Sequence, residues 1–141
     1  MKLKNAIIMA MSVLFATSCC PCRKGKSSNT PLVGTTWKAI LLDLNGSNTV
    51  ITDSEESYTL NIQDGRIGGM GDCNSYFGTF SEKNGKIEVS AMGSTKAMCH
   101  NQEREDKFMQ IIGTANGYSI EGDKLMLLNG GRVTAIFKAM K

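Results

Sequence analysis

Residues 57–91 decide the fold, and they read SYTLNIQDGRIGGMGDCNSYFGTFSEKNGKIEVSA. Short runs of alternating apolar and polar residues follow one another, and two of the breaks are Asp64-Gly65 and Asn84-Gly85. Both dipeptides accept the positive φ angles of tight hairpin turns. We therefore predict strands at 57–63, 66–70, 76–81 and 86–91.

The same pattern continues on both sides of this stretch. Further strands are expected near 36–42, 118–121, 124–128 and 132–138, with turn-forming residues at 44–48, 121–123 and 129–131 between them. Residues 101–112 predict the single helix, which has Asn101 as its cap and stops at Gly113. Many short strands with one late helix predict a mostly β fold, an antiparallel cracked barrel or sandwich on which the helix packs.

The first eighteen residues have the organisation of an export signal. Lys2 and Lys4 precede an apolar run at 6–16, and small residues follow it. That run is shorter than the roughly 20 apolar residues of a membrane-spanning helix, and its length fits a secretory signal. We expect residues 1–18 to be removed.

Cys19 follows directly and is the predicted lipid anchor. Residues 16–19, Ala-Thr-Ser-Cys, are similar to a bacterial lipobox, although Ala16 stands where Leu is typical. Ala16 and Ser18 also satisfy ordinary signal peptidase, which would cut the same bond, so a free secreted protein is the alternative. Residues 19–31 contain few apolar side chains and predict a flexible tether. One domain, residues 32–141, would follow it.

The charge of the chain is concentrated in the segments before the domain. The whole sequence carries a net charge of +3, but from Pro31 onward there are 11 basic and 13 acidic residues. A nucleic-acid-binding domain needs a basic patch on its own fold, so we expect no nucleic-acid partner. The basic tether suits contact with anionic lipid headgroups instead.

Four cysteines remain if Cys19 is lipidated. Cys20 and Cys22 lie in the tether, whereas Cys73 and Cys99 lie in the domain. We favour a Cys73–Cys99 disulfide, which would stabilise so small a domain by about 3.5 kcal/mol. Two buried free thiols are the alternative.

The sequence gives little support for a metal centre or a catalytic site. Cys20-Pro21-Cys22 lacks the spacing of zinc ligands, and extended Cys99 and His100 would point to opposite faces. His100 is the only histidine, and it is expected at the surface or beside the helix start. We therefore predict no metal, no cofactor and no catalytic residue. An enzyme would require His100 to meet a cysteine or carboxylate in a cleft.

One longer pattern resembles a known family. Gly68, Gly71, Cys73, Asn74, Tyr76, Gly78 and Phe80 are spaced as in the META domain, the HslJ-like family of bacterial envelope proteins. Residues 34–37, Gly-Thr-Thr-Trp, are similar to its opening strand, and residues 95–99, Thr-Lys-Ala-Met-Cys, to a later segment in which Met is displaced by one position. Glu105 with Phe108 resembles the start of its helix, and residues 118–127 its closing strands.

This resemblance implies a cracked β-barrel related in shape to the lipid-binding pilotins of secretins, placement in the envelope, and a link to heat shock and antibiotic tolerance. It implies no catalytic chemistry. Trp37, Tyr76 and Phe80 would be core, the glycines would allow strands to cross, and Asn74 would make a local backbone bond. Asn74 and Tyr76 are the two candidate ligand contacts.

Two functional hypotheses follow. The first is a monomeric, non-catalytic lipoprotein of the outer membrane, facing the periplasm, that binds an apolar or protein ligand or supports the envelope under stress. The second is a pilotin-like assembly partner that docks a segment of another envelope protein on a strand edge. An open apolar mouth would favour the first, and an unpaired edge beside a hydrophobic groove would favour the second.

Overall fold

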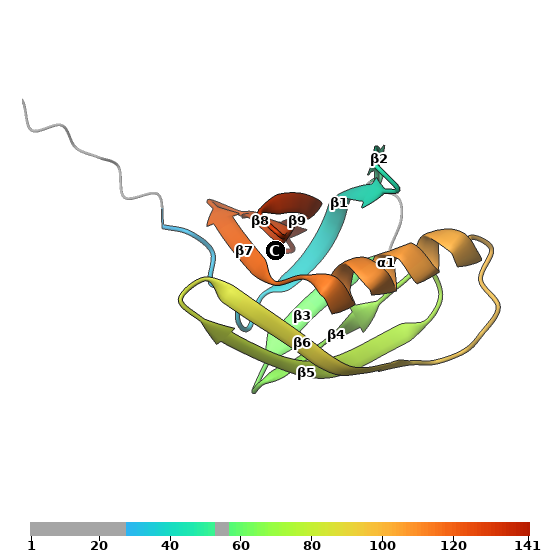
Figure 1. Ribbon diagram of the computed structural model, residues 1–141, viewed down its shortest axis with the longest axis horizontal. Helices are drawn as coiled ribbons and strands as arrows, with labels where there is room; N and C mark the ends of the chain where they lie inside the picture. The colour runs from blue at the N-terminus through green and yellow to red at the C-terminus, as the bar shows by residue number, and fades with distance from the viewer. Residues whose placement is uncertain (1–27, 53–56) are drawn as a thin grey trace, which may run out of the picture.

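The computed structural model describes residues 28–52 and 57–141, so the predicted signal, the predicted anchor Cys19, and Cys20 and Cys22 lie outside the described residues. It contains nine strands and one helix (Figure 1). The strands are β1 (Thr36–Leu44), β2 (Ser47–Val50), β3 (Thr59–Gln63), β4 (Arg66–Met70), β5 (Ser75–Lys83), β6 (Lys86–Ser94), β7 (Gly117–Glu121), β8 (Lys124–Asn129) and β9 (Arg132–Ala139), and the helix is α1 (Gln102–Thr114).

All nine strands form one antiparallel sheet in the order β2-β1-β3-β4-β5-β6-β7-β8-β9, and β1 also pairs with β9. The sheet therefore curls into a ring, which confirms the predicted mostly β cracked barrel. Eight of the nine strands were predicted. The strand that was not predicted is β2, because residues 44–48 were expected to form only a turn. Asn45 and Gly46 do form a turn, with φ angles of 57° and 82°, but it connects β1 to β2 in a hairpin.

The tight turns have the predicted chemistry. Asp64 and Gly65 have φ angles of 52° and 73°, and Asn84 and Gly85 have 53° and 78°. A two-residue turn with positive φ at both central residues has a backbone twist that matches the twist of the two antiparallel strands it connects. These turns fix β3, β4, β5 and β6 as consecutive antiparallel neighbours.

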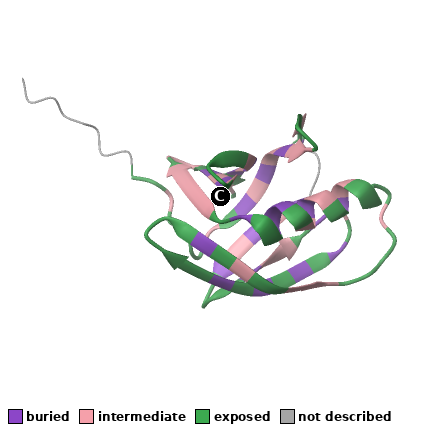
Figure 2. Ribbon diagram, viewed as in Figure 1, coloured by how far each residue is buried: buried purple, intermediate pink, exposed green. Residues whose placement is uncertain are grey.

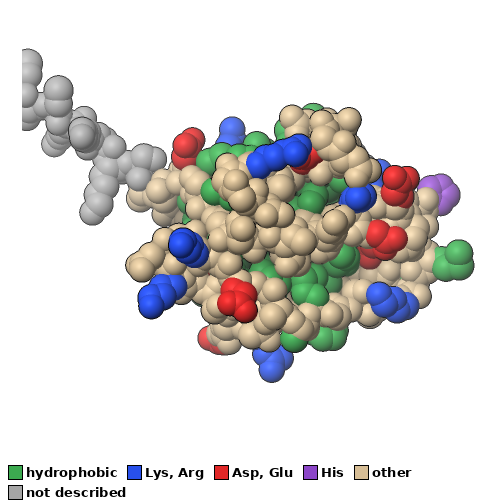
Figure 3. Space-filling model, viewed as in Figure 1, with side chains coloured by type: hydrophobic (Ala, Val, Ile, Leu, Met, Phe, Trp, Pro, Cys, Tyr) green, Lys and Arg blue, Asp and Glu red, His purple; other side chains and the backbone are tan. Residues whose placement is uncertain are grey.

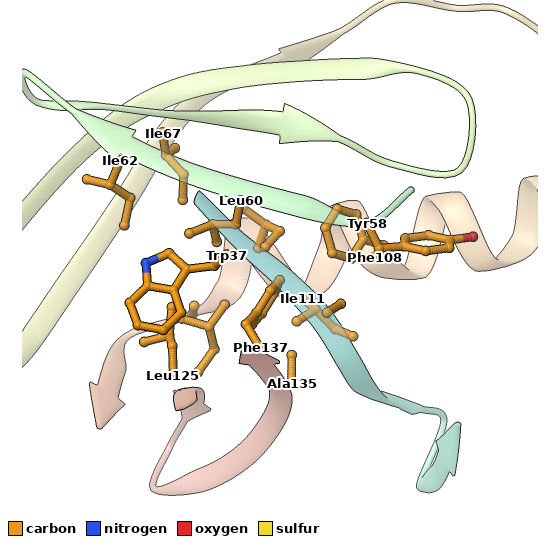
Figure 4. Packing of buried hydrophobic residues seen from close by; sticks show 14 of the residues in the cluster. Trp37, Tyr58, Leu60, Ile62, Ile67, Phe108, Ile111, Leu125, Ala135 and Phe137 are labelled. Carbon is orange, nitrogen blue, oxygen red and sulfur yellow. The ribbon is translucent and has the colours of Figure 1, made fainter. Parts of the chain in front are cut away.

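Side chains fill the inside of the ring (Figure 4), and Figure 2 marks the buried positions along the strands and on α1. Trp37 and Phe137 are fully buried, and Tyr76 and Phe80 are 3% and 6% exposed, so the expected core residues are confirmed. Phe108 of α1 makes edge contacts with Tyr58 and Tyr76, at ring-centroid distances of 5.2 and 5.6 Å. The helix is thus attached to the ring through the aromatic centre of the core.

Close backbone approach explains Gly69, which lies between Gly68 and Gly71 of the predicted motif. A Cβ on Gly69, whose φ is 156°, would lie 2.1 Å from the carbonyl oxygen of Thr59 on β3. No side chain fits at that distance, so β4 can cross beside β3 only with glycine here. Among the motif glycines, from which strand crossings are expected, a Cβ on Gly68 would lie 3.0 Å from the Tyr76 carbonyl oxygen and one on Gly78 would lie 3.1 Å from that of Ser90, so both permit tight approaches between neighbouring strands.

The ring is not closed evenly. β1 and β9 are paired from Trp37↔Ala139 to Leu42↔Ala135, whereas β6 and β7 share the single pair Lys86↔Gly117. Beyond Lys86, β6 has no partner in β7, because β7 begins at Gly117 opposite Lys86, and α1 lies along the opening (Figure 1). This opening is the crack in the barrel. The described part of the chain has no helix long and apolar enough to cross a membrane.

Candidate functional site

The crack holds a groove of about 650 Å³ between β6 and α1. Met92, Gly93 and Ser94 of β6 form one wall, which residues 95–98 continue. The other wall comes from one face of the helix, where the lining residues recur at the spacing of successive turns. They are Gln102, Glu105, Asp106, Met109, Gln110 and Gly113. Figure 3 shows hydrophobic side chains recessed among polar ones on the face that carries α1.

The β6 wall is an unpaired strand edge. In an antiparallel ladder, successive residues direct their backbone groups alternately to the two sides. The Ile87 N–H donates to the Asn116 carbonyl on the β7 side, so the backbone groups of Val89 face the same side. The Thr95 N–H donates to Ser75 of β5, so Ser94 faces away from β5. Within the described residues, 28–52 and 57–141, no strand pairs with β6 on that side beyond Lys86.

A bulge shapes this edge. The β5–β6 register shifts between Phe77 and Thr79, and Ala91 on the opposite strand has a φ of 50°. Left-handed backbone at a residue with a Cβ costs about 1–2 kcal/mol. The bulge bends β6 where it begins to line the groove, so the open edge carries local strain.

Asn74 holds the wall formed by residues 95–97. Its side chain is 3% exposed, and its Oδ1 accepts hydrogen bonds from the Ala97 N–H and the Thr95 hydroxyl, both at 2.8 Å. Its Nδ2 donates to the Ala97 carbonyl at 3.0 Å. The expected local backbone bond is made by the Asn74 carbonyl, which accepts the Gly71 N–H at 2.7 Å, whereas these side-chain partners lie more than twenty residues away in the chain. Asn74 lines the groove while bonded within the protein.

Tyr76, the other candidate ligand contact, lies in the core. Its hydroxyl donates to the Thr59 carbonyl at 2.8 Å, and it does not line the groove. Burial raises the pKa of the Tyr76 phenol far above its usual range. The side chain packs against Phe108 and thereby supports the helix wall.

Cys73 and Cys99 form the predicted disulfide, with Cα atoms 5.6 Å apart and a sequence separation of 26. It links the loop after β4 to the segment that precedes α1, in which Cys99 stands three residues before Gln102. Within that loop the Asp72 carboxylate accepts bonds from the Tyr58 hydroxyl at 3.0 Å and the Asn101 N–H at 3.2 Å. Asn101 occupies the cap position of the helix, but its side chain makes no capping bond.

Glu105 is the site residue whose role the sequence pattern did not predict. It is 2% exposed in the first turn of α1. Its Oε2 accepts the N–H groups of Asp72 at 2.5 Å and Cys73 at 3.1 Å. A Cβ on Gly71 would lie 2.8 Å from the same oxygen, so glycine makes room for the carboxylate. The resemblance placed Glu105 only at the helix start, since nothing local indicates that it is buried.

His100 is exposed and does not line the groove. Its imidazole therefore does not join Glu105 or the disulfide in a cleft. The chemistry that the groove offers is adaptable thioether surface from Met92 and Met109, amide and carboxylate groups, and free backbone groups on β6.

Three comparisons place this architecture among known proteins. No curated protein sequence matches the chain. Among solved structures, an NMR structure of a protein from Burkholderia xenovorans superposes with a TM-score of 0.64 at 18% identity, covering 78% of this chain and 84% of that one. A second NMR structure gives a TM-score of 0.58 at 18% identity, covering 76% and 90%. At this identity the likeness shows a shared fold.

The family is shown by sequence. The model of the META domain matches residues 30–141, which include every described strand, the helix, the disulfide and the groove. The predicted signature residues from Gly68 to Phe80 fall on β4, β5 and the loop between them. The chain therefore belongs to the META domain family.

Proposed function

We propose that this protein is a non-catalytic envelope lipoprotein whose META domain binds a partner in the groove between β6 and α1. Cys19 would carry the lipid and hold the domain on the periplasmic face of the outer membrane. The basic residues of the tether support this placement, since they suit an anionic lipid surface. The domain would act as a monomer.

The open edge of β6 supports an extended segment of another envelope protein as the occupant. Strand addition needs free N–H and C=O groups on a sheet edge, together with pockets for alternate side chains. Val89 and Ser94 direct such groups toward the α1 side, and the groove beside them is lined by Met92, Met109 and several polar groups. This unpaired edge beside a partly apolar groove is the observation that carries the proposal.

A free apolar ligand is the second candidate, favoured by the thioether groups of Met92 and Met109. It would have to lie in the surface groove, because the inside of the ring is occupied by side chains such as Trp37, Leu60 and Phe137, all fully buried. That packing supports an extended segment over a lipid held inside the barrel.

Native mass spectrometry of the full chain purified from envelope extract tests the occupant. We expect a peptide or protein adduct on the parent, and its loss from Met98→Asp. Met98 lines the groove and is 98% exposed, so the substitution should not disturb folding. The matched control is Val50→Asp, on β2 and 70% exposed outside the groove, which should keep the adduct. A lipid adduct would contradict the extended segment and favour the free apolar ligand as the occupant. Equal adducts on both variants would show that the partner does not bind in the groove.

A further inference from the structure

Three ligand-type side chains meet where the loop after β4 contacts the start of α1. The sulfur atoms of Cys73 and Cys99 and a carboxylate oxygen of Glu105 all lie within 4.8 Å of one another. Cys73 is exposed, Cys99 is half-buried and Glu105 is buried, so the cluster opens to solvent on one side. Sequence spacing had argued against a metal site, but spacing could not show that folding would bring these three together.

One oxygen of the Glu105 carboxylate has no partner, while the other, Oε2, lies 3.5 Å from Cys99 Sγ. Glu105 Oε2 is satisfied by two backbone N–H groups, whereas Glu105 Oε1 is buried and accepts no hydrogen bond from the described residues. A buried carboxylate oxygen without a donor is costly. A cation beside it would remove that cost.

Reduction would change the charge of the cluster. With the disulfide intact, the carboxylate is its only anionic group. With the disulfide open, two thiols sit beside that carboxylate, and their ionisation would put up to three negative charges within 4.8 Å. Asn74 Nδ2 lies 3.2 Å from Cys99 Sγ and 3.7 Å from Cys73 Sγ, where it can donate to a thiolate and orient it.

The dimensions suit zinc. Two sulfur ligands of a tetrahedral zinc with Zn–S bonds of about 2.3 Å lie about 3.7 Å apart. Cα atoms 5.6 Å apart allow that separation through side-chain rotation once the S–S bond is broken. Two thiolates and one carboxylate would leave the fourth position open to water, as in zinc sites with three protein ligands.

We propose that the reduced form of this domain binds one Zn²⁺ through Cys73, Cys99 and Glu105. In the reduction, a dithiol transfers two electrons and two protons to the Cys73–Cys99 bond and becomes a disulfide itself. Zn²⁺ binding then releases the two protons as both sulfurs become thiolate ligands. The metal and the disulfide are thus alternative ways to hold the same loop against α1. The proposal does not rest on the proposed occupant of the groove, although Glu105 and Asn74 also line it.

Cobalt substitution tests the site directly. The full chain would carry C19S, C20S and C22S, which leaves Cys73 and Cys99 as the only cysteines of the five. After reduction with a phosphine and its removal without air, CoCl₂ should give a thiolate-to-cobalt charge-transfer band that saturates at one equivalent. ZnCl₂ should abolish the band. The oxidised protein should show none, and a reduced protein without the band would overturn the proposal.

Glu105→Gln isolates the third ligand, since Gln keeps an oxygen that can accept the two N–H groups. We expect its zinc affinity to fall at least about ten-fold, while Glu103→Gln, an exposed residue of the same helical turn, retains parental affinity. Equal affinity for all three proteins would remove Glu105 from the site. X-ray absorption of the zinc-loaded parent does not depend on a variant folding. It should show two sulfur neighbours at about 2.3 Å and oxygen at about 2.0 Å, and one sulfur or none would contradict the site.

Discussion

Where β1 meets β9, the ring closes through a ladder that runs from Trp37 to Leu42, whereas β6 and β7 meet at one residue pair. The closed side is held by repeated backbone bonds and by side chains that interlock inside the ring. The open side is held by a few long-range bonds from Asn74 and Glu105, and by the Cys73–Cys99 disulfide. The first region provides global stability, and the second shapes a groove.

The largest expected effect is on the closed side. Trp37→Ala should lower the free energy of unfolding by about 3–5 kcal/mol, because the indole is fully buried and its removal leaves a cavity. Urea denaturation measures the change. Phe77→Ala, whose ring is 62% exposed, is the control and should change stability by less than about 0.5 kcal/mol. Similar losses from both would mean that the ring does not carry the stability assigned to it.

A smaller and local effect is expected on the open side. Asn74→Ala leaves the Ala97 N–H and carbonyl without their side-chain partners and should cost about 1–3 kcal/mol. Amide hydrogen exchange should accelerate most at residues 95–98, while the amides between β1 and β9 keep their protection. Uniform acceleration across the ring would show that the two regions are one cooperative unit.

A gain in stability is expected at Ala91, the strained residue of the β6 edge. Ala91→Gly should raise stability by up to about 1 kcal/mol, because glycine accepts the φ of 50° without penalty. Thermal unfolding measures it. Ala97→Gly, an exposed alanine on the same wall without positive φ, should lower stability by about 0.5–1 kcal/mol. A loss at Ala91 would mean that the bulge is not strained.

The smallest effect depends on pH. The pKa of Tyr76 is raised in the folded protein by burial, while in the unfolded chain it stays near 10. The free energy of unfolding therefore keeps its full value below about pH 10. It falls at higher pH, because the Tyr76 phenol ionises in the unfolded chain before it ionises in the folded protein. Tyr76→Phe should cost about 1 kcal/mol at neutral pH through the lost bond to Thr59. The difference from the parent should narrow above about pH 10, and parallel pH profiles would contradict this assignment.

The same contrast explains what the sequence could predict. Most of the ring consists of alternating strands joined by turns such as Asp-Gly and Asn-Gly, so local pattern was enough for eight strands, whereas the core positions of Trp37 and Phe80 came from the resemblance to the META domain. β2 was missed because Asn45-Gly46 is a hairpin turn whose second strand, Ser47–Val50, is short and polar.

On the open side, local pattern could not suffice. The disulfide followed from cysteine arithmetic, but the partners of Asn74 lie in residues 95–97, and the burial of Glu105 depends on Gly71, over thirty residues earlier. Such contacts join segments that are far apart in the sequence, and no periodic pattern of residues indicates that these segments meet. The groove itself exists because β7 begins opposite the first residue of β6 and α1 lies along the rest of that strand, an arrangement that depends on the whole ring.

Hydrogen exchange at two β6 amides, measured by NMR on the full chain with and without the envelope segment that co-purifies, tests the central claim most directly. The Val89 and Ser94 amides should exchange much faster than that of Ile87 in the free protein, because within the described residues Ile87 alone of the three donates to a backbone carbonyl on that side, that of Asn116 just before β7. In the complex both should become protected. Protection already present in the free protein, or exchange unchanged by the segment, would contradict an open edge that docks a strand.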